Sequence, residues 1–419
     1  MYKKIKKIIK KFVDYTIIDD TRIYTLKHTK LSVKRSLTKA FEDAYGTLPI
    51  EQRKIVVDNY MGQGYGCNCK YVTEALLESG QPYDIVWVVK NATEREAEFP
   101  EGVRLVEYLS AEAMREYATA GVWLCNYHLV AYFNRGLQKK PGQTYIQMWH
   151  GSFGIKKIEN DCGILTENKS WLYLAQKNSK NTDYWISNSG FETEVYRHAF
   201  WDVKEVLEYG HPRNDVFFGQ DLNTCEQRVK QALAIEAKTN ILLYVPTFRE
   251  KNAFPQEKLD VERLKNTLCE VTGQEWCVVV RLHPRMREQM ESVCAGSTEG
   301  VYRADNYSDI QELLAAAQMV ITDYSSCIFD FLLTGRPGFI YAPDIEAYND
   351  ERGFYYRLEQ TPFPIAAGNK ELCENIRNFD RELYQTKTDE FFLDKGSVED
   401  GNAAKRVCGL IQNILLEKE

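Results

Sequence analysis

Short apolar runs alternate with stretches of helical periodicity along most of this chain, and no other feature limits its possible folds as strongly. The first series opens at Lys54–Asn59 (KIVVDN), continues at Asp84–Val89 (DIVWVV) and reaches Tyr145–Met148, with helical patterns such as Asn68–Ser79 in between. Strands that alternate with helices usually pair in parallel, and the helices cover both faces of the sheet. The pattern therefore predicts an α/β fold.

A second series of the same kind begins at Ile241–Val245 and runs through a helix over Val261–Val271 to a strand at Met319–Ile321. A chain of 419 residues is long enough for two such units, each with its own core. We expect two Rossmann-like lobes that face each other across a cleft. The expected units are a basic segment over 1–48, an N-terminal lobe over 49–205, a C-terminal lobe over 206–400, and a helix over 401–419 that packs back on the lobes.

The beginning of the chain is strongly basic. Residues 1–50 hold 12 Lys and Arg against 5 Asp and Glu, whereas the whole chain has a net charge of −7. On a helical projection, an arc of about 140° that contains no lysine holds the apolar residues Ile5, Ile8, Ile9, Phe12 and Val13. This pattern predicts a helix over residues 1–13 that lies on an anionic membrane surface. A helix packed on the protein's own body would show the same pattern and stays an alternative.

Composition excludes several classes of protein. The chain beyond the basic segment is acidic, which argues against a nucleic-acid partner. No apolar run approaches the roughly 20 residues of a membrane-spanning helix. The eleven cysteines show no metal-ligand spacing and no signal peptide precedes them, so we expect reduced thiols. Together these features predict a cytoplasmic protein that is peripheral on the inner face of the cell membrane.

A strand, a turn with two serines and a helix follow one another between Met319 and Tyr341 (MVITDYSSCIFDFLLTGRPGFIY). Such a turn directs the free N–H groups at the start of the helix, with their partial positive charge, toward one point. That point suits a phosphate group. The alternative is that Ser325 and Ser326 only cap the helix.

Other strands also end in polar loops, and ligands of open parallel sheets bind beyond the carboxyl ends of the strands. Three of the six histidines, His150, His211 and His283, lie in these loops or between the lobes, beside Arg, Thr and Ser. Arginines and hydroxyl groups bind phosphate oxygens, and a histidine of near-neutral pKa transfers protons. The set therefore fits a polyphosphate ester as ligand.

Five motifs occur in the order and spacing that the CDP-glycerol glycerophosphotransferases show: QMWHGSFGIKKI (147–158), GHPRND (210–215), PTFRE (246–250), RLHP (281–284) and ITDYSSCIFDF (321–331). The chain resembles this family from about Lys54 to Glu417. The resemblance implies a GT-B architecture in which the C-terminal lobe holds most of the nucleotide. It also implies transfer of glycerol phosphate from CDP-glycerol to a hydroxyl of a lipid-linked or glycan acceptor in teichoic acid or capsule synthesis, with release of CMP.

The resemblance also implies roles for individual residues. His150 would take the proton of the acceptor hydroxyl, while His283 and Arg281 would contact the pyrophosphate and stabilise charge on the leaving CMP. Ser325 and Ser326 would bind phosphate, and Asp330 would accept a hydrogen bond from a ribose or glycerol hydroxyl. The other expected substrate-binding residues are Trp149, Gly151, Ser152, Phe153, Arg213, Pro246, Thr247 and Leu282.

For three loop residues we expect or allow a structural role. We expect Asp323 to orient its loop by accepting hydrogen bonds, because a carboxylate that pointed at a phosphate would repel it. Arg249 either serves the donor pocket or pairs with Asp215 or Glu250. His211 stands where the family more often has tyrosine, so we assign it no catalytic role.

The chain departs from the family pattern at two further positions, and two other functions fit the same sequence. Ser152 and Phe153 replace the threonine and proline that are more usual in the family, which puts the shape of that loop in doubt. No Asp-X-Asp pattern lies near the expected phosphate site, so we predict no required metal and no other cofactor. One alternative is a CDP-ribitol or nucleotide-sugar transferase of the same architecture. The other is a non-catalytic, membrane-associated subunit of capsule assembly, against which the presence of both His150 and His283 counts.

Overall fold

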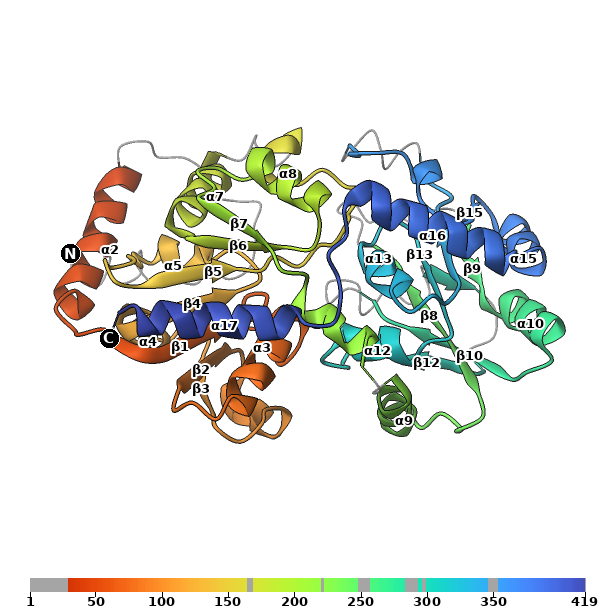
Figure 1. Ribbon diagram of the computed structural model, residues 1–419, viewed down its shortest axis with the longest axis horizontal. Helices are drawn as coiled ribbons and strands as arrows, with labels where there is room; N and C mark the ends of the chain where they lie inside the picture. Colours follow the sequence, from red (N-terminus) through yellow and green to blue (C-terminus); the bar gives the residue numbers. More distant parts are fainter. Residues whose placement is uncertain are drawn as a thin grey trace, which may run out of the picture.

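The computed structural model describes residues 29–163, 169–219, 222–247, 257–282, 293–295, 299–345 and 353–418. Two lobes lie side by side along its long axis (Figure 1). Three expectations lie outside the described residues: the membrane-surface helix over residues 1–13, the proposed role of His283, and the pairing of Arg249.

The first lobe is built on a seven-stranded parallel sheet with the order β3-β2-β1-β4-β5-β6-β7. The order reverses between β1 and β4, and such a reversal opens a crevice at the carboxyl ends of the two strands. The strands are β1 (Glu51–Asp58), β2 (Asp84–Val89), β3 (Val103–Glu107), β4 (Ala120–Cys125), β5 (Thr144–Gln147), β6 (Tyr184–Ser187) and β7 (Glu205–Glu208).

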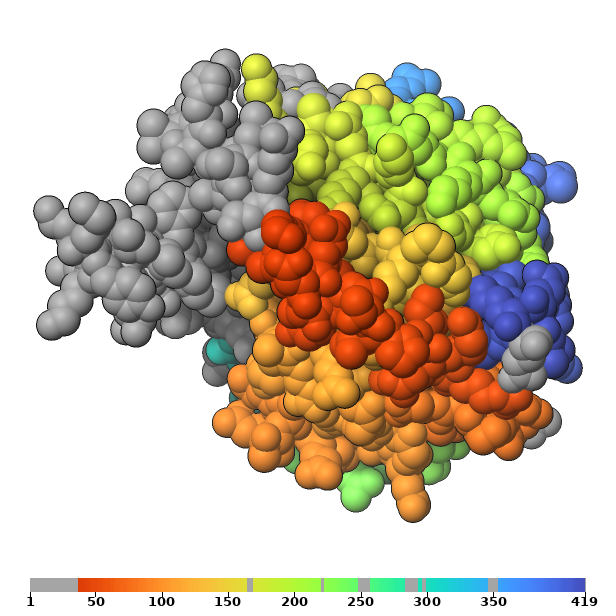
Figure 2. Space-filling view, turned by 90° about the vertical axis from the view of Figure 1, so that its left-hand side faces the viewer, coloured from red at the N-terminus to blue at the C-terminus, as the bar shows by residue number. Residues whose placement is uncertain are grey.

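Helices cover both faces of this sheet because successive strand residues point to opposite sides. Ile55 and Val57 pack on α3 (Cys67–Glu78) and α17 (Ala403–Leu416). Val56 lies in the core on the other face, which α2, α4, α5 and α7 cover. These helices are α2 (Thr29–Tyr45), α4 (Ala111–Thr119), α5 (Val130–Asn134) and α7 (Lys169–Asn181). Figure 2 shows the later part of α2, in red, on the outside of the lobe.

The second lobe repeats the arrangement with a six-stranded parallel sheet of order β12-β10-β8-β13-β14-β15. Here the order reverses between β8 and β13. The two sheets confirm the predicted fold of two Rossmann-like lobes. The strands are β8 (Asn240–Val245), β10 (Trp276–Val280), β12 (Val301–Arg303), β13 (Met319–Thr322), β14 (Gly338–Tyr341) and β15 (Ile365–Ala366), and a separate short pair is β9 (Leu259–Asp260) with β11 (Cys294–Ala295).

One core of the second lobe contains residues of α9, α12, α13 and α16, and the core on the opposite face contains residues of α10 and α15. The bounds are α9 (Leu222–Leu233), α10 (Val261–Thr272), α12 (Ile310–Ala316), α13 (Cys327–Leu332), α15 (Asn369–Arg377) and α16 (Arg381–Lys395). The other helices within the described residues are α8 (Gly190–Ala199) and the 3-10 helices η1 (Ala92–Glu98), η2 (Glu159–Asp161), η3 (Pro212–Phe217) and η5 (Leu358–Gln360).

The ends of the lobes differ from the expected bounds. The boundary expected between residues 205 and 206 falls inside β7, which pairs with β6 and belongs to the first sheet. The sequence of β7, EVLE, gives a weak signal because an edge strand has one neighbour and needs few apolar residues. In the expected basic segment, α2 places Phe41 in the core of the first lobe.

The lobes are joined at η3, where the chain first crosses between them, and through two further segments. After α16 of the second lobe, the chain crosses back, and α17 packs on α3 of the first lobe (Figure 1). The loop that follows β5 pairs with the loop at 353–355: the backbone N–H of Tyr355 donates to Ile155 O at 2.7 Å, and that of Lys157 donates to Gly353 O at 3.0 Å. These two hydrogen bonds tie the loop that carries His150 to the second lobe.

Candidate active site

The loop after β5 carries the first group of predicted site residues. The buried Asn68 side chain donates to the carbonyl oxygens of Met148 at 3.1 Å and Trp149 at 3.0 Å. Trp149 and Phe153 both have left-handed backbone conformations, with φ of 49° and 43°. Non-glycine residues adopt this conformation at a cost in free energy, and such residues concentrate at functional sites. The fold therefore holds this loop in one specific, strained shape.

His150 lies near the middle of this loop and is partly exposed. Its Nδ1 lies 3.0 Å from the backbone oxygen of Asn126, which can only accept a hydrogen bond. Nδ1 therefore carries the proton, and Nε2 keeps its lone pair. Loss of solvation is the main cause that lowers the pKa of His150 from its usual 6.5 to about 3; the hydrogen bond to Asn126 opposes this shift, and the charges of Arg213, His128 and Lys156 add to it. The imidazole is consequently neutral at physiological pH and able to accept a proton.

Ser152 and Phe153, the two departures from the family pattern, are buried. Ser152 Oγ accepts a hydrogen bond from Asn188 Nδ2 at 2.7 Å. The Phe153 ring packs on Phe329 and Phe391 of the second lobe, and its carbonyl accepts from the Tyr356 hydroxyl. Ser152 thus fixes the loop to the end of β6 in the first lobe, and Phe153 fixes it to the second lobe.

The turn between β13 and α13 lies across from this loop. Ser325 and Ser326 are both partly exposed, and Ser326, at the helix N-cap, makes no side-chain capping hydrogen bond. The Ser325 hydroxyl donates to Cys327 Sγ at 3.2 Å. The side chains of these serines therefore do not cap the helix, which was the alternative reading of the sequence. Asp323 behaves as expected, because its Oδ1 accepts from the backbone N–H groups of Thr247 at 2.9 Å and Tyr324 at 2.6 Å.

The two loops come together at Gly154. A Cβ atom at this glycine would lie 3.7 Å from Ser326 Cβ, so the backbone after His150 runs next to the serine turn. Lys156 follows two residues later, and its charge acts to lower the pKa of both His150 and Cys327, although burial raises the pKa of Cys327 overall. Lys156 therefore supplies a positive charge near both the histidine and the serine turn. Sequence reasoning passed over it, although QMWHGSFGIKKI contains it.

Arg213 and Asp330 meet in the buried centre of the molecule. Arg213 Nε donates to Asp330 Oδ2 at 2.9 Å and Nη2 to Oδ1 at 3.2 Å, and both side chains are almost fully buried. Asn214 and Gln311 donate to the same carboxylate at 3.1 Å each. Burial acts to raise the pKa of Asp330, but the charge and hydrogen bonds of Arg213 outweigh it and hold this pKa below its usual value.

This network differs from the substrate-binding roles that the sequence suggested for Arg213 and Asp330. Four protein donors already occupy the carboxylate oxygens of Asp330, which leaves no lone pair for the ribose or glycerol hydroxyl that the sequence suggested. Arg213 Nη2 also donates to Gly151 O at 2.8 Å. The arginine is thus linked to the His150 loop on one side and to the carboxylate of α13 on the other.

The remaining predicted residues lie at the ends of β8 and β10. Pro246 is buried and Thr247 is partly exposed after β8. Arg281 is partly exposed and donates from Nη1 to Tyr307 O at 2.5 Å. Leu282 is buried, and its backbone N–H donates to Asp305 at 2.8 Å. These residues follow neighbouring strands of the second sheet, as the sequence predicted, whereas His283 lies outside the described residues.

Two other histidines are structural. The fully buried His211 lies with Nε2 2.8 Å from Glu192 Oε2, in agreement with the decision to give it no catalytic role. His128, also buried, lies 3.3 Å from Glu159 through Nε2 and packs edge-on against Trp149. Neither ring reaches the surface that His150 faces.

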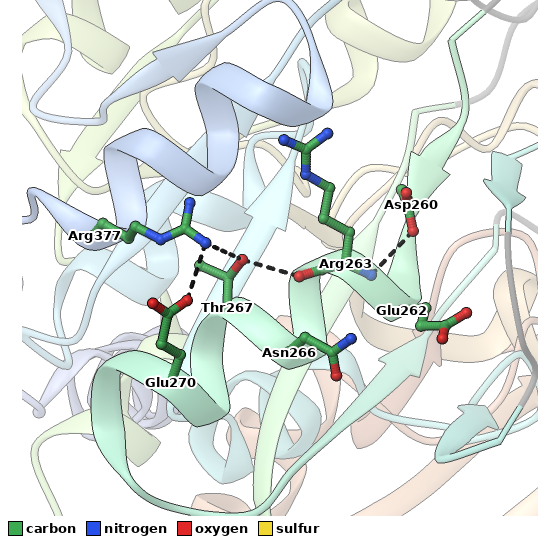
Figure 3. Close-up of a pocket in the computed structure, with 7 residues that line it drawn as sticks. All are labelled: Asp260, Glu262, Arg263, Asn266, Thr267, Glu270 and Arg377. Atoms are coloured by element: carbon green, nitrogen blue, oxygen red, sulfur yellow. Dashed lines mark hydrogen bonds and ion pairs between the residues drawn. The ribbon is translucent and has the colours of Figure 1, made fainter.

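A cavity of about 330 Å³ opens elsewhere on the second lobe (Figure 3). Arg377 lines it and donates to Glu270 at 3.0 Å and Thr267 at 3.4 Å. This cavity lies on α10 and α15, which cover the sheet face opposite to α13, and it contains none of the predicted site residues. Its full lining is Asp260, Glu262, Arg263, Asn266, Thr267, Glu270 and Arg377.

In the part of the chain that the structure describes, no three His, Cys, Asp or Glu side chains gather in a way that could hold a metal ion. Within the same residues, no helix has the length and the hydrophobicity needed to cross a bilayer.

The sequence is similar to those of teichoic acid polymerases. The chain is 31% identical to the teichoic acid poly(glycerol phosphate) polymerase of Bacillus spizizenii, over 86% of this chain and 92% of that protein. It is 30% identical to the polymerase of the same name from Staphylococcus epidermidis, over 94% of this chain but only 56% of that protein. The chain thus spans about half the length of the second relative.

Solved structures of the wall teichoic acid polymerase TagF share the fold. One of them superposes with a TM-score of 0.79 at 27% identity, covering 94% of this chain and 96% of that one. A TagF variant soaked with CDPG superposes with a TM-score of 0.77 at the same identity and coverage. These superpositions confirm the predicted GT-B architecture. Residues 41–413 match the family described as CDP-Glycerol:Poly(glycerophosphate) glycerophosphotransferase, and the chain therefore belongs to that family.

Proposed function

We propose that this chain transfers glycerol phosphate from CDP-glycerol to a hydroxyl group of a membrane-associated acceptor in teichoic acid or capsule synthesis, releasing CMP. The arrangement of His150 is the main support: its Nδ1 is held by a backbone carbonyl, its Nε2 keeps the lone pair, and its loop adjoins the serine turn of the other lobe. Membership of the family and the structure of a TagF variant soaked with CDPG support CDP-glycerol as the donor.

In the proposed reaction, His150 Nε2 takes the proton of the acceptor hydroxyl as its oxygen attacks the phosphorus next to glycerol. The bond from that phosphorus to the bridging oxygen breaks, and CMP leaves with the electron pair. Ser325 and Ser326, at the start of α13, bind the pyrophosphate together with Lys156, and Arg281 and His283 stabilise the charge on CMP. Trp149, Pro246, Thr247 and Leu282 shape the walls of the substrate site.

Arg213 and Asp330 are positioning residues in this proposal. Their ion pair joins η3 to α13, and the further hydrogen bond from Arg213 to Gly151 O holds the loop of the base. A base must stay within hydrogen-bond reach of the proton that it removes, so a fixed loop favours the reaction.

The choice of donor is tested by CMP release. The protein is incubated with a lipid-linked acceptor and, in parallel, with CDP-glycerol, CDP-ribitol or a nucleotide sugar. CMP release from CDP-glycerol with the highest kcat/KM is the expected result. Release from CDP-ribitol alone, or of a nucleotide from the sugar donor alone, would reject glycerol phosphate as the group that is transferred.

Lys156 provides a sharper test of the phosphate site. Lys156→Gln removes a positive charge near His150 and the serine turn, and we expect a loss of about tenfold to a hundredfold in kcat/KM for CDP-glycerol. Lys157→Gln, one residue further along and therefore subject to the same change in net charge, is the matched control and should retain activity. Equal losses in the two variants would show that the effect is not local to the phosphate site.

The predicted helix over residues 1–13 is the basis for a proposed peripheral location at the inner face of the membrane. Removing these residues should weaken binding to vesicles that contain anionic lipids, and should slow transfer to a lipid-linked acceptor more than transfer to a soluble one. Sedimentation with vesicles measures the first effect. Unchanged vesicle binding would support the alternative, a helix packed on the protein's own body.

A further inference from the structure

Two tyrosines lie beside His150, and the mechanism above leaves them without a role. The Tyr60 ring meets the His150 ring edge-on at a centroid distance of 4.9 Å, and the Tyr127 ring lies 5.3 Å from it. The two tyrosine rings are 4.7 Å apart. All three side chains are partly exposed, so they form one open aromatic surface, which we call the tyrosine platform (Tyr60 and Tyr127).

The platform is built at the point where the strand order of the first sheet reverses. Tyr60 follows β1 and Tyr127 follows β4, and these two neighbouring strands lie on either side of the reversal. In open parallel sheets, the crevice at such a point is where ligands bind. The sequence offered little sign of this, because a tyrosine in a loop is a common residue and the two lie far apart in the chain.

One buried residue holds the platform and the base together. Asn126 Oδ1 accepts from the backbone N–H of Tyr60 at 2.8 Å, and its Nδ2 donates to Asn59 Oδ1 at 2.7 Å. Its own carbonyl accepts the hydrogen bond from His150 Nδ1. The Tyr127 ring stacks on Trp149 at 5.9 Å with an angle of 10° between the planes. The platform therefore has a fixed position relative to His150.

The backbone under the platform is strained. Tyr60 and Met61 are consecutive residues with φ of 46° and 59°, in the left-handed region that non-glycine side chains avoid. Strain of this kind persists where the surroundings enforce it, and it concentrates at ligand-binding sites. The hydrogen bond from Tyr60 N to Asn126 is one of the contacts that enforce it here.

The charges around His150 are distributed unevenly. Lys156 belongs to the stretch of loop that passes the serine turn at Gly154 and bridges to Phe354 of the second lobe, and Arg213 is committed to Asp330 and Gly151. The platform side consists of phenol rings, which are uncharged at neutral pH. A charged pyrophosphate is favoured on the lysine side, so the acceptor hydroxyl reaches His150 from the platform side. An aromatic ring can cover the apolar C–H face of a sugar, and a phenol hydroxyl can form a hydrogen bond with the hydroxyl groups at the edge of the sugar.

We propose that Tyr60 and Tyr127 form an acceptor subsite that binds the uncharged sugar ring whose hydroxyl reacts. This inference rests on the proposed function, because it takes His150 as the base. It also states a preference: a pyranose ring stacks on the platform, whereas a linear polyol phosphate has no flat apolar face to offer and carries a charge within a few bonds of its hydroxyl.

The test measures binding of two probes in the absence of any donor. The probes are an octyl hexopyranoside and an octyl-tailed glycerol phosphate dimer, titrated into the full chain. The wild-type protein should bind the pyranoside more tightly. Tyr60→Leu and Tyr127→Leu should each weaken pyranoside binding by about threefold to tenfold, the size of an aromatic stacking contact, while the phenylalanine variants should lose less. Tyr173→Leu, at a tyrosine that is 52% exposed on α7, is the matched control and should bind as the wild type does.

A second readout needs no variant. Saturation of aromatic protons in an NMR difference experiment on the wild type should transfer to the C–H protons on one face of the pyranoside. Absence of this transfer, tighter binding of the linear probe, or unchanged affinity of folded leucine variants would overturn the inference. CMP release is measured separately. If the protein releases CMP but does not bind the pyranoside, only the proposed acceptor subsite is refuted. If it binds the pyranoside but does not use CDP-glycerol, only the proposed donor is refuted.

Discussion

His150→Ala is expected to lower kcat for glycerol-phosphate transfer by about a hundredfold to ten-thousandfold, the range that a general base contributes. Binding of CDP-glycerol should change little, because the imidazole acts on the acceptor hydroxyl and not on the nucleotide. Rates come from CMP release, and affinity from calorimetry with CDP-glycerol alone. A variant that loses donor affinity in proportion to its rate would make His150 a donor ligand and not the base.

The matched control is His198→Ala, which removes a histidine that is 53% exposed on α8 in the same lobe. It should turn over like the wild type. Normal turnover by His150→Ala would contradict the assignment of the base.

The pH profile should distinguish this histidine from an ordinary one. Burial lowers the pKa of His150 to about 3, so the free enzyme keeps its base unprotonated far below pH 6.5. The acid limb of kcat/KM reports the pKa of the essential base in the free enzyme, and we expect that limb below about pH 5. An acid limb centred near pH 6.5 would indicate a solvated imidazole or a different base.

Asp330→Asn is expected to reduce the free energy of unfolding by about 3–5 kcal/mol, the usual cost of removing one partner of a buried ion pair. The variant leaves the Arg213 guanidinium, whose side chain is 2% exposed, without its countercharge. Denaturant unfolding followed by fluorescence measures the change. Because the carboxylate pKa is held below its usual value, this stabilisation is present at neutral pH and is lost as pH falls below about 4.

An exposed ion pair supplies the control for this prediction. Glu270 lies 3.0 Å from Arg377, and both side chains are largely solvated, at 65% and 43% exposure. Glu270→Gln should cost less than about 1 kcal/mol. If Asp330→Asn unfolded like the wild type but lost CDP-glycerol affinity, the carboxylate would be a donor ligand and the buried-network account would be wrong.

Much of the fold was predictable because the hydrophobic patterns are regular. Asp84–Val89 was predicted as a strand with the bounds that the structure gives it, and the helix predicted over Val261–Val271 is one residue longer in the structure. The edge strand β7 was missed because EVLE has only two apolar residues, side by side and without alternation, and cannot be distinguished from a loop. The C-terminal helix was predicted to pack back on the lobes, but its apolar face alone does not specify that it packs on α3 of the first lobe.

The candidate site was also predictable only in part. Because parallel strands place their carboxyl ends at one edge, the sequence predicted the loops that carry His150, Thr247 and Ser326. It did not predict that Arg213 and Asp330 pair with each other, because residues 117 positions apart meet only through the docking of the lobes. Each was therefore assigned to the ligand, although the structure shows their hydrogen bonds directed to protein groups.

The most direct test of the account is mass spectrometry of the acceptor after reaction with CDP-glycerol, with CMP measured in the same sample. We predict that a lipid-linked acceptor gains whole glycerol phosphate units, one for each CMP released, and that His150→Ala gives neither product. CMP release without any gain in acceptor mass, or a gain only when CDP-ribitol or a nucleotide sugar is the donor, would contradict the account.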